Sequence, residues 1–160
     1  MRLLVLYIYI LKNIIMKKWF LGSLKYEKVM ENGKEKKVTE KYLIDALSVT
    51  EAEARLIEEM SPFISGDFSI KAVVDTKYAE VVPSDNEADD TWFKCKLGYI
   101  TLDEKTGAEK TTTTNMLVQA ADLRQAVKNL DEYMKGTMAD YRIESVSDSK
   151  IMDVYPYNNK

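Results

Sequence analysis

The chain has 160 residues, a net charge of -3 and a hydrophobic fraction of 46%, which is the composition of a globular protein. It has no histidine and one cysteine, which excludes disulfide frameworks, Ser-His or Cys-His catalytic pairs and the usual Cys/His zinc sites. The slightly acidic balance argues against a protein that coats duplex DNA by overall charge. We therefore expect a cytoplasmic protein without a cofactor and without catalytic residues.

The first fifteen residues, MRLLVLYIYILKNII, form a short apolar run behind Arg2. The run ends before the roughly 20 apolar residues that are needed to span a bilayer, and no small-residue cleavage site follows it. Met16 opens the stretch MKKWF, so we expect residues 1–15 to be a non-native extension from a misassigned start. A targeting segment is the alternative interpretation, and no membrane association is expected.

The stretches WFLGSLKYEK at 19–28 and WFKCKLGYIT at 92–101 place Trp, Phe, Leu and Tyr at the same spacing. Further matches follow at an offset of 73 or 74 residues, as between Leu43 and Leu117. Such self-similarity predicts a tandem duplication. We assign residues 16–83 to repeat unit 1, residues 84–91 to an acidic linker and residues 92–157 to repeat unit 2.

In the first repeat, apolar residues at every second position of 20–26 predict a strand with one buried face. The turn sequence ENGK at 31–34 and a second alternating stretch at 42–46 complete a hairpin. Ser48 and Glu51 then form a capping box at the start of a helix whose apolar stripe ends at Met60. The stretches FSIKAVV and KYAEVVP predict one or two further strands that end at Pro83.

The linker sequence SDNEADD, 84–90, predicts a solvated loop. Its acids have a spacing suited to a hard cation, but the glycine and the final glutamate of a calcium loop are missing, so no metal site is expected. The second repeat carries the same signals, with the turn KTGA at 105–108 and the capping pair Asp122 and Gln125. The predicted fold is α+β: two strand-strand-helix-strand units with antiparallel sheets and two helices, packed about a pseudo-twofold axis.

Two features suggest binding. Trp92, Lys94 and Lys96 share the strand face away from Phe93 and Cys95, and Trp19 takes the matching position in the first repeat. Rings interleaved with lysines suit single-stranded nucleic acid, although packing between the repeats or between protomers is the preferred explanation of the tryptophans. The second feature is a lysine-rich first hairpin, in which either binding or a solvated edge accounts for the charge; its members are Lys34, Lys36, Lys37 and Lys41. Cys95 faces inward and is expected to be a core residue.

The segments KKVTEKYLIDALSVTEAEARLIEEM, ITLDEKTGAEK, MLVQAADLRQAV and KGTMADY, together with WFLGSLKYEK, resemble a domain-of-unknown-function family of gut anaerobic bacteria, their mobile elements and their phages. The resemblance extends from Met16 to Tyr157. It implies a small accessory protein of a phage or mobile element, and it brings no catalytic residue or cofactor to this chain.

These patterns lead us to expect a non-catalytic binding protein whose partner is single-stranded nucleic acid. Two alternatives stay open. One is an anti-defence factor that sequesters a host protein or a small nucleotide, which the acidic surface would suit. The other is an oligomeric structural component, a homo-oligomer that buries the second apolar face of its sheets.

Overall fold

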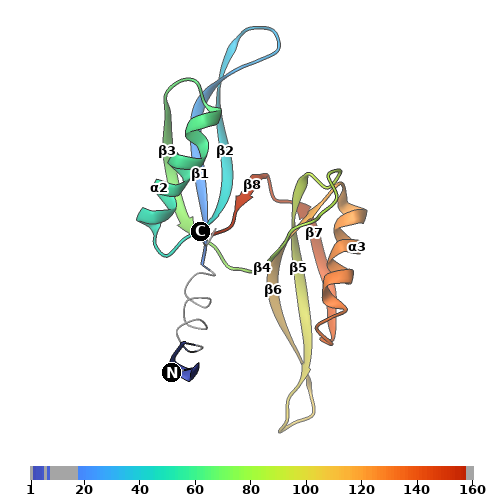
Figure 1. Ribbon diagram of the computed structural model, residues 1–160. Helices are drawn as coiled ribbons and strands as arrows, with labels where there is room; N and C mark the ends of the chain where they lie inside the picture. The colour runs from blue at the N-terminus through green and yellow to red at the C-terminus, as the bar shows by residue number, and fades with distance from the viewer. Residues whose placement is uncertain (1, 6, 8–17, 158–160) are drawn as a thin grey trace. The chain divides into compact units, whose positions relative to one another are not determined.

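A computed structural model describes residues 2–5, 7 and 18–157 of the protein (Figure 1). The expected extension at 1–15 and the start at Met16 lie largely outside the described residues. The chain divides into two compact units: unit 1 runs to Thr76 and resumes at Met152, and unit 2 is Lys77–Ile151. Both units combine helix and antiparallel sheet, so the α+β class is confirmed.

Unit 1 contains a four-stranded sheet in the order β3-β1-β2-β8. Its elements are β1 (Trp19–Val29), β2 (Glu35–Asp45), α2 (Val49–Met60), the short 3-10 helix η1 (Ser61–Phe63), β3 (Phe68–Asp75) and β8 (Ile151–Tyr155). The hairpin of β1 and β2 turns at Gly33, whose φ of 77° is a backbone conformation that glycine adopts without strain. The predicted first hairpin is therefore present.

Unit 2 has a four-stranded sheet in the order β4-β6-β5-β7. Its elements are β4 (Tyr78–Val82), β5 (Thr91–Leu102), β6 (Glu109–Ala120), α3 (Leu123–Met134) and β7 (Tyr141–Asp148). The pairing of β4 with β6 is parallel, which corrects the prediction that the sheets are antiparallel throughout. In each unit a twelve-residue α-helix packs against the sheet, α2 in unit 1 and α3 in unit 2 (Figure 1).

The core of each unit lies between its helix and its sheet. In unit 1 the side chains of Phe20, Leu24 and Ile44 pack with Leu56 of α2. Gly22 lies directly under that helix: a Cβ there would approach Leu56 Cδ2 to 2.5 Å, so the glycine makes room for the leucine. The predicted helix stripe is therefore the buried one.

In unit 2 the corresponding core is formed by Phe93, Leu97 and Val118 of the sheet and Leu130 of α3. Cys95 belongs to this core, is 0% exposed and forms no disulfide. Burial raises the pKa of its thiol to about 11, so the nucleophilic thiolate is disfavoured at neutral pH. The prediction that Cys95 is a core residue is confirmed.

One strand of each sheet comes from the other predicted repeat: β4 of the first repeat pairs in the sheet of unit 2, and β8 of the second repeat pairs in the sheet of unit 1. β4 follows β3 after only Thr76 and Lys77, yet it pairs with β6 of unit 2. β8 likewise follows β7 after Ser149 and Lys150, yet it is hydrogen-bonded to β2 of unit 1. The compact units therefore follow the sheets and not the predicted boundaries at 83 and 92, and the duplication itself stays a prediction.

The two helix starts carry the predicted N-caps. Ser48 Oγ accepts a hydrogen bond from the Glu51 N–H at 3.2 Å, and Asp122 Oδ1 accepts one from the Gln125 N–H at 2.8 Å. The return bond of a full capping box is replaced in unit 2, where the Gln125 amide donates to Asn129 Oδ1 at 2.8 Å. The caps were thus predictable, whereas the second half of the box at Gln125 was not.

Replacing either cap by alanine should lower the free energy of unfolding by about 1 kcal/mol, because one N–H of the first helical turn loses its acceptor. Ser48→Ala and Asp122→Ala can be compared by urea unfolding with Thr50→Ala, an exposed position just inside α2. Equal losses in all three variants would show that the caps contribute nothing specific.

Candidate functional site

The two tryptophans lie in different environments. Trp19 is half-buried at the start of β1, whereas Trp92 is only 5% exposed. The Trp92 backbone is also held, since its carbonyl accepts hydrogen bonds from Ser149 Oγ at 2.6 Å and from Ser149 N–H at 3.0 Å. A ring buried to this extent offers no free face to a nucleic-acid base, so only Trp19 keeps the geometry that stacking needs.

Lys94 and Lys96 are exposed on the face of β5 opposite α3. Lys96 Nζ lies 3.7 Å from Glu144 Oε2, and the same carboxylate is 3.6 Å from Arg142 Nε. Lys94 lies opposite Leu117 on one side and Ser147 on the other. Part of the predicted positive charge of this face is therefore compensated within unit 2.

The four predicted lysines of the first hairpin do not form one patch. The register pairs Lys36 with Lys28, on the α2 side of the sheet, while Lys37 and Lys41 lie on the opposite side. Lys34 lies in the turn, where its N–H donates to Asn32 Oδ1 at 3.0 Å. Adjacent strand positions point to opposite faces, so Lys36 and Lys37 could never have shared a surface.

Lys25 joins Lys37 and Lys41 on the face opposite α2. Lys25 is paired with Thr39, the residue between the two lysines on that face of β2, so it is the diagonal neighbour of both. Diagonal neighbours in antiparallel pairs lie about 7–8 Å apart. We call these three exposed residues, Lys25, Lys37 and Lys41, the lysine cluster.

A groove of about 710 Å³ borders the lysine cluster at the outer end of the same face. Lys25 and Lys37 line it together with Glu27, which is paired directly with Lys37. Two further acids, Glu35 of β2 and Asp67 of the loop before β3, also line the groove. The groove is therefore of mixed charge, and Lys41 is the one member of the lysine cluster that does not line it.

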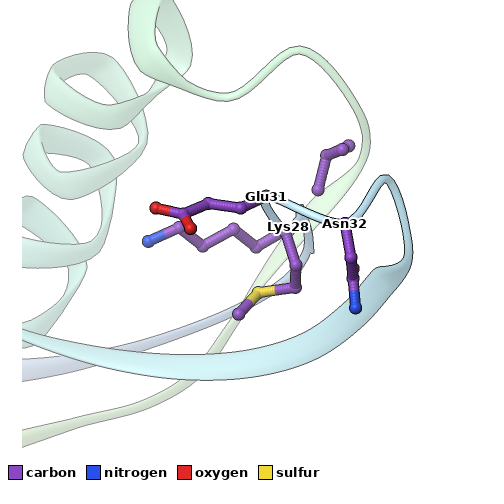
Figure 2. A pocket seen from close by; sticks show the side chains of 5 residues that line it. Lys28, Glu31 and Asn32 are labelled. Atoms are coloured by element: carbon purple, nitrogen blue, oxygen red, sulfur yellow. The ribbon is translucent and has the colours of Figure 1, made fainter.

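A second recess of about 460 Å³ lies at the tip of the first hairpin. Figure 2 shows that Lys28 and Glu31 extend to one side of the hairpin, while Asn32 points away from them. One cation, one anion and a diverging amide do not form a set that could hold a charged ligand. The recess is thus a feature of the turn.

Glu40 joins two tyrosines on the α2 side of unit 1. It accepts hydrogen bonds from Tyr26 and, at 3.4 Å, from Tyr42. Burial and the bond to Glu40 raise the pKa of Tyr26 to about 12, and burial with the charge of Glu40 raises the pKa of Tyr42 as well. Both hydroxyls stay protonated at neutral pH and act as donors that hold the strands.

A polar clamp at the end of β2 holds the C-terminal residues of unit 1. Arg55 of α2 donates to the Asp45 carbonyl and, at 3.1 Å, to the Pro156 carbonyl, and its guanidinium lies 5.2 Å from the Tyr157 ring centroid. Asp45 is 8% exposed, accepts from the Tyr157 backbone and has one carboxylate oxygen without a hydrogen-bond partner. Burial raises the pKa of Asp45 to about 6.

Unit 2 has a counterpart of this clamp in which Asn129 of α3 takes the place of the arginine. Asn129 of α3 donates to the Gln119 carbonyl at 2.9 Å and to Asp89 Oδ2 at 3.1 Å, and the Ser84 N–H donates to Gln119 Oε1 at 3.0 Å. Asp89 is 5% exposed, and its bonds from Ser84 and Asn129 lower its pKa. The expectation that the acidic linker is solvated throughout is therefore wrong at Asp89, because that carboxylate caps the segment after β4.

Among residues 2–5, 7 and 18–157, no group of three or more Cys, Asp or Glu side chains converges as a metal site. No helix within that part of the chain has the length and apolar character required to cross a bilayer.

Comparison with known proteins places the chain in a family. No curated protein and no solved structure matches it. A family model described as a domain of unknown function, DUF4494, matches residues 18–157, which cover both units. Since that match covers most of the sequence, the protein belongs to the DUF4494 family.

Proposed function

We propose that the protein is a non-catalytic binding protein and that the lysine cluster of unit 1 contacts single-stranded nucleic acid. The observation that supports this most is the triangle of Lys25, Lys37 and Lys41 around Thr39. Within the described residues no carboxylate lies within 4.0 Å of their ammonium groups. Three exposed cations on adjacent strands, none of them in a salt bridge although Glu27 is the cross-strand neighbour of Lys37, suit a flexible phosphate backbone.

Trp19 completes the proposed surface. It lies on the same face of β1 as Lys25, six residues away, which corresponds to about 20 Å along a strand. A single strand that contacts the lysine cluster could therefore stack a base on the exposed part of Trp19 three or four nucleotides further on. Trp92 is left out of the surface because it is buried, and Lys94 and Lys96 stay a separate prediction for unit 2.

The proposal extends to biological context. The resemblance to proteins of phages and mobile elements supports an accessory role in such an element. A protein partner from the host is the second candidate, and the mixed-charge groove beside Lys25 and Lys37 favours it, because a peptide can pair with both signs of charge.

The proposed function is tested by fluorescence anisotropy with a labelled, short single-stranded oligonucleotide of mixed sequence. Three phosphate contacts give a salt slope near -2, so the affinity should fall about 20-fold between about 50 and 200 mM salt. The triple variant Lys25→Gln, Lys37→Gln, Lys41→Gln should lose most of the affinity and of the salt slope. Its fold is checked by circular dichroism.

A control variant has the same net charge as the first triple variant but leaves the lysine cluster intact. The exposed lysines of unit 2, Lys105, Lys110 and Lys128, are replaced together by glutamine. Wild-type affinity in this control, with loss only in the first triple variant, supports the proposal. Equal loss in both variants would indicate non-specific attraction, and an absence of binding to the wild type would transfer the assignment to a protein partner.

A further inference from the structure

The C-terminal strand β8 has an unusual place in the fold. It follows β7 directly, yet β7 lies in the sheet of unit 2 and β8 in the sheet of unit 1. The division between the compact units falls at the very start of β8, between Ile151 and Met152. β8 therefore belongs to unit 1, although the strand that directly precedes it in the chain belongs to unit 2.

Unit 1 holds β8 by specific side-chain contacts as well as by strand pairing. The Tyr155 ring stacks on Tyr42 with centroids 6.0 Å apart, and its hydroxyl contacts Met60 Sδ at 3.6 Å. Beyond the strand, Arg55 donates to the Pro156 carbonyl and lies over the Tyr157 ring. These contacts involve only β8, its following residues and unit 1, so they would be the same whichever chain supplied the strand.

The connection between β7 and β8 is short and strained. It consists of Ser149 and Lys150, and Lys150 has a φ of 62°, a left-handed conformation that a lysine rarely adopts. Asp148 supports that conformation by accepting from the Lys150 N–H at 2.9 Å. Short connections under strain favour strand exchange, because an extended connection relieves the strain and gives up only the hydrogen bonds of the turn itself, such as the one from the Lys150 N–H to Asp148.

We propose that the slot beside β2 accepts β8 of a second copy of this chain, which gives a reciprocal dimer in which each copy completes unit 1 of the other. β8 is better suited to exchange than β4, the other strand that crosses between units. β4 is tethered on both sides, by Thr76 and Lys77 before it and by the 83–90 segment after it. The connection before β8 carries the positive φ of Lys150, whereas neither Thr76 nor Lys77 before β4 has a positive φ.

Two substitutions of the exposed residue Lys150 test the proposal in the full-length chain. Lys150→Pro forbids the positive φ and removes the N–H that Asp148 holds, so the connection must open. This variant should be mainly dimeric by size-exclusion chromatography with light scattering. Lys150→Gly removes the strain of the closed connection, which should favour the closed form about fivefold per connection. Because a dimer has two connections, the dimer dissociation constant should rise about 25-fold, and this variant should be more strictly monomeric than wild type.

A third variant identifies the strand that exchanges. Adding Tyr155→Asp to Lys150→Pro damages β8 and should abolish the dimer. A folded, monomeric Lys150→Pro variant would overturn the proposal, as would a dimer that survives Tyr155→Asp. If Lys150→Pro does not fold, wild type and Lys150→Gly are refolded from urea at high concentration and compared. A larger dimer fraction for wild type supports exchange, and equal fractions reject it.

Discussion

Raising the pH from about 4 to about 7 should lower the free energy of unfolding by about 2 kcal/mol through Asp45 alone. Burial raises the pKa of this carboxyl from 3.8 to about 6, so the folded state holds the proton more tightly than the unfolded state does. The contribution is fully present below the unfolded pKa of 3.8 and is lost as the pH rises through about 6.

The groups that face Asp45 set the size of this effect. The Tyr157 N–H and the charge of Arg55 favour the carboxylate, while Glu51 disfavours it, and burial outweighs them. One carboxylate oxygen has no hydrogen-bond partner within the described residues, which is why the charged form is costly. Gln119 takes the matching position in unit 2, where its neutral amide accepts from the Ser84 N–H at 3.0 Å.

Asp45→Asn isolates the contribution. Asparagine keeps an acceptor for the Tyr157 N–H and carries no charge, so this variant should be more stable than wild type at pH 7 and should lack the loss between about pH 4 and 7. Urea unfolding of both proteins across this range measures the difference between their free energies of unfolding. Asp89, whose lowered pKa produces the opposite trend, is present in both proteins, so its contribution cancels in that difference. Parallel curves for the two proteins would contradict a buried, charged Asp45.

Arg55→Ala should lower the free energy of unfolding by about 2 kcal/mol at neutral pH. The guanidinium donates to the carbonyls of Asp45 and Pro156; the first bond is part-buried, and the second is exposed, so solvent weakens its contribution. Its contact with the Tyr157 ring adds to this. The loss should be accompanied by faster exchange of the backbone amides of β8, because the clamp holds the end of that strand.

Arg55→Lys is the matched variant. Lysine keeps the charge beside Asp45 but cannot donate to two separate carbonyls at once, so it should recover less than half of the loss. The exposed residue Glu58 on the same helix provides a neutral reference when it is replaced by alanine. Full stability in Arg55→Lys would mean that the charge alone matters and that the two carbonyl bonds do not.

Local signals predicted most of the elements correctly. Alternation over 20–26, the Asn32-Gly33 turn and the helix stripe are properties of short segments, and each is decided by the backbone geometry of that segment. The N-caps at Ser48 and Asp122 belong to the same class. The α+β class follows from the order of these elements, because a helix with one apolar stripe requires a sheet to bury it.

Strand partnership could not be predicted in the same way. The FSIKAVV and KYAEVVP stretches are separated by a two-residue connection, which usually produces a hairpin, yet β3 and β4 lie in different sheets. Alternation specifies which face of a strand is buried but not which sheet edge the strand joins. The Arg55 and Asn129 clamps, which hold the ends of β8 and β4, are residues of the helices and give no signal in the strand sequences.

The candidate site was partly predictable. Strand parity alone separates Lys36 from Lys37 and joins Lys25 to the latter, so the lysine cluster could have been derived from sequence once the hairpin register was known. The burial of Trp92 could not be derived from sequence, because strand parity identifies the face on which a side chain lies and not what covers that face. The same holds for Asp89, whose neighbours Ser84 and Asn129 converge only in the folded chain.

The most direct test of the binding proposal is to map backbone amide chemical shifts of the isotope-labelled protein while a short single strand is added. The proposal predicts changes that cluster on Ser23, Lys25, Thr39 and Lys41, that saturate with the added strand and that reverse as salt is raised. Changes confined to unit 2, or shifts that stay the same at saturating oligonucleotide, would contradict the assignment of the lysine cluster as the binding surface.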